Sequence, residues 1–171
     1  MCLLAFAYNH NLDAPLIVIS NRDEFYRRET LPMHWWQDCA VLAGRDQQAG
    51  GTWLGLSKNG RFAAVTNFRD IHRNGMETGN LRSRGDLVTA FLCASDDANS
   101  WADALVDTSS DYGAFNLVIY DGQDMIYLNN QGDPKRILTS GVYALSNHQL
   151  DSPWPKVDHA REQLVNVVTH Q

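Results

Sequence analysis

The sequence predicts an α+β domain in which antiparallel sheets are covered by helices. Three observations favour this fold class. Short apolar segments occur in pairs, and two of these pairs are joined by the turn residues Asn59-Gly60 and Asp121-Gly122. Two amphipathic helical segments lie between the first and the second group of strands, and a third follows them. Strands that come in hairpins, with helices inserted as a block, are not the pattern of βαβ repeats.

The first half of the chain is predicted to be mostly strands. Residues 2–8 and 16–20 are apolar, aromatic or β-branched, and the turn-rich residues 9–15 between them indicate a hairpin. A second hairpin is predicted for 52–57 and 61–68, because Asn59-Gly60 tolerates the positive φ angles of a tight turn. We expect the polar residues 69–80 to form a loop.

The second half is predicted to contain three helices and three strands. Apolar side chains recur about every 3.6 residues in 87–92 and in 101–106, as on the buried face of a helix. Strands are predicted at 115–120, 125–128 and 141–146, the first two as a hairpin. After Pro155, an apolar stripe from Val157 to Val168 predicts a last helix. This stripe needs a partner surface, which leaves a homodimer open.

The composition is that of one globular domain covering residues 1–171, with 44% hydrophobic and 20% charged residues. A formal net charge of −6 argues against general electrostatic binding to nucleic acid or anionic membranes. The first residues lack the basic start of a signal peptide, and their apolar run falls short of the roughly 20 residues of a membrane span. Cys2, Cys39 and Cys93 have no zinc-ligand or CxxC spacing, so we expect no catalytic metal and a reducing, cytoplasmic compartment.

Cys2 is the residue on which any chemistry is expected to centre. Removal of Met1 would leave Cys2 with a thiol and a free α-amine, whose reference pKa values are about 8.5 and about 7.7–8.0. One residue could then supply a nucleophile and its base, as in N-terminal Thr and Cys hydrolases. Many proteins begin with Met-Cys, so a structural Cys2 is the alternative.

A polar tetrapeptide follows directly on the predicted strand 16–20. It consists of Asn21, Arg22, Asp23 and Glu24. At the rim of a sheet, Arg22 and a carboxylate could hold a thiolate or a substrate anion. We therefore expect Arg22 to lower the pKa of the Cys2 thiol. A solvated turn is the alternative.

Asn67 and Asn147 each come at the end of a predicted strand. A side-chain amide there can donate to a developing oxyanion. Ordinary turn chemistry is the alternative for both residues.

The segment Met33-His34-Trp35-Trp36 is the best local candidate for an apolar ligand-binding surface with a histidine beside it. Exposed aromatic rings of this kind would suit a flat apolar ligand. The alternative is that His34, Trp35 and Trp36 lie at the edge of the core or in the wall of a pocket.

Four blocks of sequence together resemble the NRDE family, also called the transport and Golgi organisation family. They read MCLLAFAY, SNRDEFYRR, GGTWLGLSKNGRFAAVTNFR and ALSNHQLDSPWPKV, and they extend to about residue 157. This family is similar to the cysteine-type N-terminal-nucleophile hydrolases, such as penicillin V acylases and bile-salt hydrolases. The resemblance implies an αββα fold, in which two antiparallel sheets are stacked between layers of helices.

The resemblance also implies roles for individual residues. Cys2 takes the place of the nucleophile, and Asn67 and Asn147 match the two asparagines near the oxyanion. The arginine and aspartate of the hydrolases fall among residues 21–24, where several alignments remain open. Family members continue through strands with a YGTRSST-like segment that supplies a late arginine. This implies that the chain lacks the last strands of the family fold.

Two functions follow from the resemblance. Family members are linked to intracellular movement of haem and to lipid and acyl-chain metabolism, which implies a cytoplasmic carrier of haem or of an amphipathic acyl compound. The alternative is an amidohydrolase that cleaves linear amides with Cys2. We favour the carrier, because Met1 precedes Cys2 and the late arginine is missing. A module that binds other proteins and no small ligand is a third hypothesis.

Overall fold

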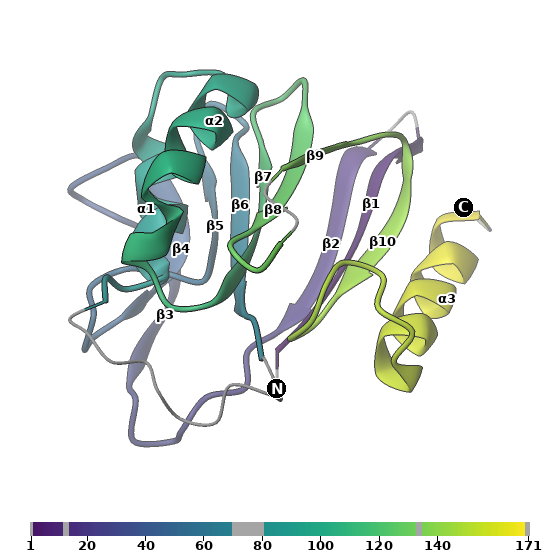
Figure 1. The fold of residues 1–171 in the computed structure, drawn as a ribbon, viewed down its shortest axis with the longest axis horizontal. Helices are drawn as coiled ribbons and strands as arrows, with labels where there is room; N and C mark the ends of the chain where they lie inside the picture. The colour runs from purple at the N-terminus through teal and green to yellow at the C-terminus, as the bar shows by residue number, and fades with distance from the viewer. Residues whose placement is uncertain (1, 12–13, 70–80, 133–134, 170–171) are drawn as a thin grey trace.

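The computed structural model describes residues 2–11, 14–69, 81–132 and 135–169, which form two antiparallel sheets and three α-helices (Figure 1). The small sheet has the strand order β10-β1-β2, with β1 at Leu3–Asn11, β2 at Ala14–Asn21 and β10 at Gly141–Leu145. The large sheet has the order β3-β4-β5-β6-β7-β8-β9. Its strands are Thr30–Trp35, Val41–Asp46, Leu54–Ser57, Phe62–Asn67, Phe115–Tyr120, Met125–Asn129 and Arg136–Leu138. The helices are α1 (Gly85–Cys93), α2 (Ala98–Thr108) and α3 (Pro155–Thr169), and a 3₁₀ turn, Ser109–Asp111, follows α2.

These elements form four layers: α3, the small sheet, the large sheet, and α1 with α2 (Figure 1). The middle strand β1 shows how the sequence builds them. Leu4 and Phe6 pack against the large sheet, whereas Ala5 and Ala7 face α3. Because β1 is buried on both faces, its sequence is a nearly continuous apolar run. The small alanines let the helix lie close to the sheet.

The fold class and the three helices agree with the sequence analysis, as do the hairpins β1–β2, β5–β6 and β7–β8. Gly60 and Gly122 have φ angles of 78° and 101° in the two predicted turns. Residues 70–80 of the predicted loop lie outside the described part of the chain.

Strands β3, β4 and β9 were not predicted. β3 is the edge of the large sheet, contains Pro32, and is mostly exposed, so its apolar residues show no simple alternation. β4 ends in Gly44-Arg45-Asp46, which is unusual for a strand. β9 has only three residues.

The apolar stripe of α3 packs on the small sheet of the same chain through Val157, Leu164 and Val168. The partner surface that the sequence required is therefore internal, and the stripe is no longer evidence for a homodimer. Within the described residues, no helix is both long enough and apolar enough to cross a membrane.

Candidate functional site

A cavity of about 320 Å³ opens beside Cys2, and we call it the Cys2 cavity. Polar and charged side chains dominate its lining, which includes Cys2, Arg22, Asp23, Glu24, Arg28, Asp46, Asn67, Arg82 and Arg84. Trp53 and Val65 add apolar surface. The cavity thus combines a thiol with several arginines and carboxylates.

Cys2 directly precedes β1, and contacts from two neighbouring strands hold it there. The Ser146 hydroxyl, just after β10, donates to the Cys2 carbonyl at 2.7 Å. The Ser20 hydroxyl of β2 donates to the Leu3 carbonyl at 3.1 Å. The position of the thiol therefore depends on both partners of β1 in the small sheet.

Asn67 and Asn147 lie together, although their strands belong to different sheets. The buried Asn147 side chain donates to the Asn67 carbonyl at 2.9 Å, and the Arg69 N–H donates back to the Asn147 carbonyl at 2.7 Å. Asn67 lines the Cys2 cavity, whereas Asn147 is absent from its lining. Asn147 thus supports the backbone at the end of β6.

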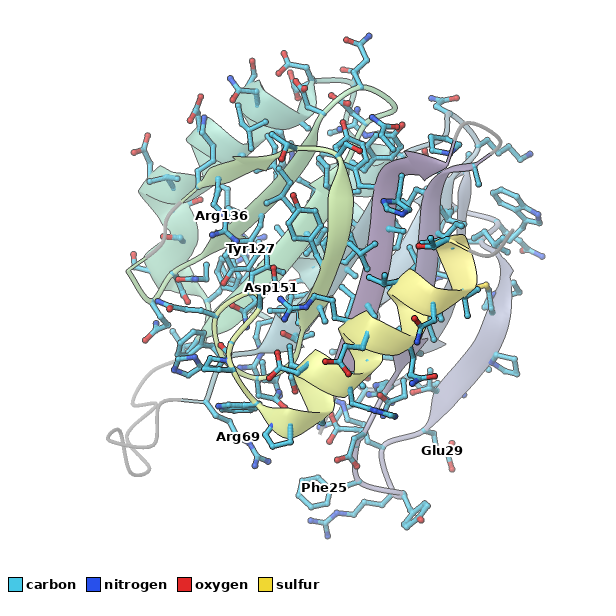
Figure 2. All side chains as sticks on the ribbon, turned by 90° about the vertical axis from the view of Figure 1, so that its right-hand side faces the viewer. Phe25, Glu29, Arg69, Tyr127, Arg136 and Asp151 are labelled. Atoms are coloured by element: carbon cyan, nitrogen blue, oxygen red, sulfur yellow. The ribbon has the colours of Figure 1, made fainter. Side chains whose placement is uncertain are left out.

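A buried network behind these residues was missed by the sequence analysis. The Thr66 hydroxyl donates to the Ser146 carbonyl at 2.6 Å, and the Asn116 amide donates to the Thr66 hydroxyl at 3.2 Å. Tyr127 donates to the Asn116 side-chain oxygen at 2.8 Å and accepts from Leu150 N–H at 3.2 Å. Figure 2 shows Tyr127 beside the segment that carries Asp151, which follows Leu150. The sequence feature that could have indicated this network is Asn116, a polar residue inside the fully buried strand β7.

Two arginines and two carboxylates form a compact charged cluster at the Cys2 cavity. Asp46 accepts from Arg28 at 2.7 Å and from Arg22 at 3.1 Å, and both arginines lie within 4 Å of Glu24. Arg22 also stacks over Trp53, 4.9 Å from the ring centre. Arg28 and Asp46 were not predicted, because nothing local in the sequence indicates an ion pair between separate segments.

Asp46 is ionised despite its burial. Burial alone would raise the pKa of Asp46, but hydrogen bonds from the Ala49 N–H and from Arg28, with the charge of Arg28, lower it. The carboxylate therefore neutralises arginine charge inside the cavity at neutral pH.

Arg22 lowers the pKa of the Cys2 thiol, as expected, but the net shift of this pKa is upward. Burial makes the largest contribution and raises the pKa, and nearby positive charges, that of Arg22 among them, offset it only in part. Arg22 is itself paired with Asp46 and Glu24. The thiol is protonated at neutral pH.

The remaining residues singled out in the sequence lie elsewhere. Asn21 pairs with Leu3 in the β1–β2 hairpin and does not line the cavity, whereas Asp23 does. His34, Trp35 and Trp36 lie on or just after the edge strand β3, away from the Cys2 cavity lining.

Trp36 belongs to the core, as the core-edge alternative expected. It is buried, donates its indole N–H to the Ala43 carbonyl at 3.1 Å, and carries Arg45 over its ring. Trp35 is about half exposed, and Lys58 lies over its ring. His34 is exposed, with Nδ1 at 2.7 Å from the Pro32 carbonyl.

A second hollow, of about 490 Å³, lies between β2 and β5, and we call it the β2–β5 groove. Its lining is mostly apolar and includes Leu16, Val18, Leu54, Leu56, Phe62 and Tyr120. The same two segments contribute to both hollows, since Ser20 and Leu54 line the groove while Arg22 and Trp53 line the cavity. The molecule thus has a charged hollow and an apolar hollow on shared segments.

The described histidines do not line either hollow. Across the described ranges, no three His, Cys, Asp or Glu side chains are arranged to hold a metal ion.

Comparison with known proteins gives a consistent result. A family model described as Transport and Golgi organisation 2 matches residues 1–171. The chain is 34% identical over 182 residues to the Transport and Golgi organization protein 2 homolog of Homo sapiens, and 33% identical to the homolog of Mus musculus. It is also 29% identical over 198 residues to an uncharacterized protein of Saccharomyces cerevisiae. Each match covers 98% of this chain but only 62–64% of the relative, so the chain spans less than two thirds of their length.

Proposed function

The chain belongs to the Transport and Golgi organisation 2 family, and we propose that it is a cytoplasmic carrier of haem or of a similar anionic, amphipathic ligand. We further propose that its four layers are those of the N-terminal-nucleophile hydrolase fold, with the hydrolase cleft used for binding. The layer order of helix, sheet, sheet and helices supports this relationship.

The observation that carries the proposal is the arginine-lined Cys2 cavity, together with the apolar β2–β5 groove on the same two segments. Arginine binds carboxylates such as haem propionates through paired, charge-assisted hydrogen bonds. A flat apolar ring system gains free energy when its surface leaves water for an apolar groove. Both hollows have volumes within the range of about 300–1,000 Å³ that is usual for small-molecule sites.

Among the cavity-lining arginines, Arg82 is the best candidate to contact a ligand carboxylate. Arg22 and Arg28 already pair with Asp46 and Glu24. Arg82 is exposed, and its guanidinium lies 4.8 Å from the centre of the Tyr112 ring. A stacked guanidinium keeps its edge N–H groups available for a bidentate partner.

Cys2 is the residue in the cavity that could ligate haem iron, since a thiolate is a known axial ligand. Its raised pKa keeps it protonated at neutral pH, so coordination would require loss of that proton. Affinity is therefore expected to come first from the carboxylates and the apolar ring, and only second from iron.

Haem titration followed by absorbance tests the proposal. We compare haemin, iron-free protoporphyrin and haemin dimethyl ester, which lacks the free carboxylates. The wild type should bind the first two with similar affinity and the ester more weakly. Arg82→Ala should weaken haemin binding about tenfold, the equivalent of one charge-assisted hydrogen bond. Leu56→Glu, in the groove, should weaken all three ligands.

The matched control is Arg27→Ala, because Arg27 stacks on the exposed Phe25 and does not line the cavity. Haemin affinity should be unchanged in this variant. The proposal fails if the wild type binds none of the three ligands, or if Arg82→Ala and Leu56→Glu both bind like the wild type.

The position of Cys2 favours a second candidate function, hydrolysis of linear amides. With Met1 removed, the α-amine could take the thiol proton while the sulfur attacks the amide carbonyl. The Asn67 side chain at the cavity could stabilise the oxyanion. As the tetrahedral intermediate collapses, the C–N bond breaks and the protonated α-amine gives its proton to the leaving amine. Water then hydrolyses the thioester, which releases the acid and restores the thiol. Intact mass measures Met1 removal, and an acyl-amide panel measures turnover. A processed protein that cleaves amides only when Cys2 is present would establish this function.

A further inference from the structure

The other two cysteines line one hollow beside α1, although they are distant in sequence. Cys39 is in the turn between β3 and β4, and Cys93 is the last residue of α1. Both line one open hollow, which we call the thiol groove, together with Trp36, Asp38, Arg45 and Ala90. Within it, the neighbouring Cys39 side chain contributes to a raised pKa of Cys93.

Both sulfurs are carried by well-anchored backbone. The Lys58 N–H donates to the Ala40 carbonyl at 3.0 Å, which ties the turn after Cys39 to the end of β5. Helix α1 packs so closely on β5 that a Cβ at Gly55 would lie 2.9 Å from Leu92 Cδ1. A disulfide requires two Cβ atoms to approach closely without backbone strain, and Cys39 and Cys93 line the same hollow from these two anchored segments.

The pair is also accessible to small reagents. Cys93 is exposed and Cys39 is partly exposed at the edge of the core. Cys2 lines the Cys2 cavity and not the thiol groove, although the two hollows share Ala49, Gly51 and Arg82. A bond between Cys39 and Cys93 would therefore leave the Cys2 thiol free.

The Cys93 thiol is a weak nucleophile at neutral pH. Burial, and then the neighbouring Cys39 side chain, raise the pKa of Cys93 to about 11. Cys93 therefore keeps its proton at neutral pH.

We propose that Cys39 and Cys93 are a reversible disulfide pair that forms by exchange with a small-molecule disulfide. In the first step, Cys39 loses its proton to solvent and its thiolate attacks one sulfur of the small disulfide, which releases one small thiolate. In the second step, Cys93 loses its proton and attacks the Cys39 sulfur of the mixed disulfide, which releases the second thiolate. The two cysteines lose two electrons and two protons, and the small disulfide becomes two thiols.

The experiment uses the reduced full chain and oxidised glutathione. After exchange, free thiols are blocked with N-ethylmaleimide, and intact mass and a non-reducing digest are measured. Before blocking, the intact mass should fall by two hydrogens. The digest should contain one linked peptide pair with Cys39 and Cys93, and dithiothreitol should reverse the link fully. Cys2 should carry N-ethylmaleimide.

Two variants separate the pair from unspecific thiol oxidation. Cys93→Ser, at an exposed position, should stop at a glutathione adduct on Cys39, whereas Cys2→Ser should form the linked peptide like the wild type. The proposal is overturned if Cys39 and Cys93 carry separate glutathione adducts without a linked peptide, or if the link joins two chains. Because no haem or amide substrate is present, the result does not depend on the proposed function.

Discussion

Tyr127→Phe tests whether the buried network holds the two sheets in register. The Tyr127 side chain is fully buried in β8, between the sheets. Its hydroxyl donates to Asn116 at 2.8 Å and accepts from Asn129 at 2.7 Å and from Leu150 N–H at 3.2 Å. Phenylalanine keeps the ring and removes all three contacts.

The expected loss of stability follows from these contacts. A typical hydrogen bond contributes about 1 kcal/mol net, so three of them amount to roughly 3 kcal/mol. In the variant, Asn116, Asn129 and the Leu150 N–H stay buried without this hydroxyl as a partner, so the loss in the free energy of unfolding should be at least this large. For a chain of this size, the loss corresponds to a fall in melting temperature of about 6–12 °C.

Urea unfolding, followed by tryptophan fluorescence and far-UV circular dichroism, measures the effect. The control is Tyr143→Phe, because the Tyr143 hydroxyl donates to the Thr139 carbonyl at an exposed position. This variant should change the free energy of unfolding by less than about 0.5 kcal/mol. If the two variants lose equal stability, the Tyr127 network does not stabilise the sandwich and the reasoning fails.

Four further results are expected. Asp46→Asn should destabilise the protein at pH 7, and its difference from the wild type should shrink as the pH falls below about 4. The lowered pKa means that ionised Asp46 stabilises the fold, and this contribution is lost when the carboxylate is protonated. Urea unfolding at several pH values measures the difference in stability, and a constant difference would contradict the reasoning. Gly51→Ala should cost about 1–3 kcal/mol, because its Cβ would lie 2.7 Å from the Gly85 carbonyl carbon; wild-type stability in thermal unfolding would contradict this. Cys2 should react slowly with iodoacetamide at pH 7 and faster towards pH 9, as mass spectrometry can measure, since its pKa is raised; a pH-independent rate would argue against a protonated thiol. The disulfide-bonded form should resist urea better than the reduced form, by up to roughly 4 kcal/mol for a loop closed between residues 39 and 93; equal midpoints would mean that the bond strains the native fold.

Local patterns predicted much of the fold. The turns at Gly60 and Gly122 need positive φ angles, and the neighbouring strands and helices show the period of their buried faces. No local sequence pattern of this kind predicts that β1 pairs with β10, for example Leu4 with Leu145, because the two strands are far apart in the sequence. An edge strand such as β3 lacks the alternation by which strands are recognised, because neither of its faces is well covered.

The site was predicted only in part. The family resemblance led us to expect Cys2, Asn67 and Asn147 at one cleft. Cys2 and Asn67 line one cavity, whereas Asn147 does not line it and instead hydrogen-bonds to the Asn67 backbone. The ion pairs of Asp46 with Arg22 and Arg28 join residues from separate segments, and such pairs depend on tertiary structure. The sign of the Arg22 contribution to the pKa of Cys2 was predicted, but the net upward shift was not, because the burial that causes it is invisible in sequence.

The pairing of β1 with both β2 and β10 has a consequence for the order of folding. As the chain emerges from the ribosome, β1 meets β2 almost at once, but a hairpin of two strands is only marginally stable in water. Its third strand is synthesised more than a hundred residues later, and Ser146, which holds the Cys2 carbonyl, follows that strand. Contacts this distant in sequence form slowly. The segment of β1 is therefore among the last to reach its final position, and during this interval its apolar side chains stay exposed to water.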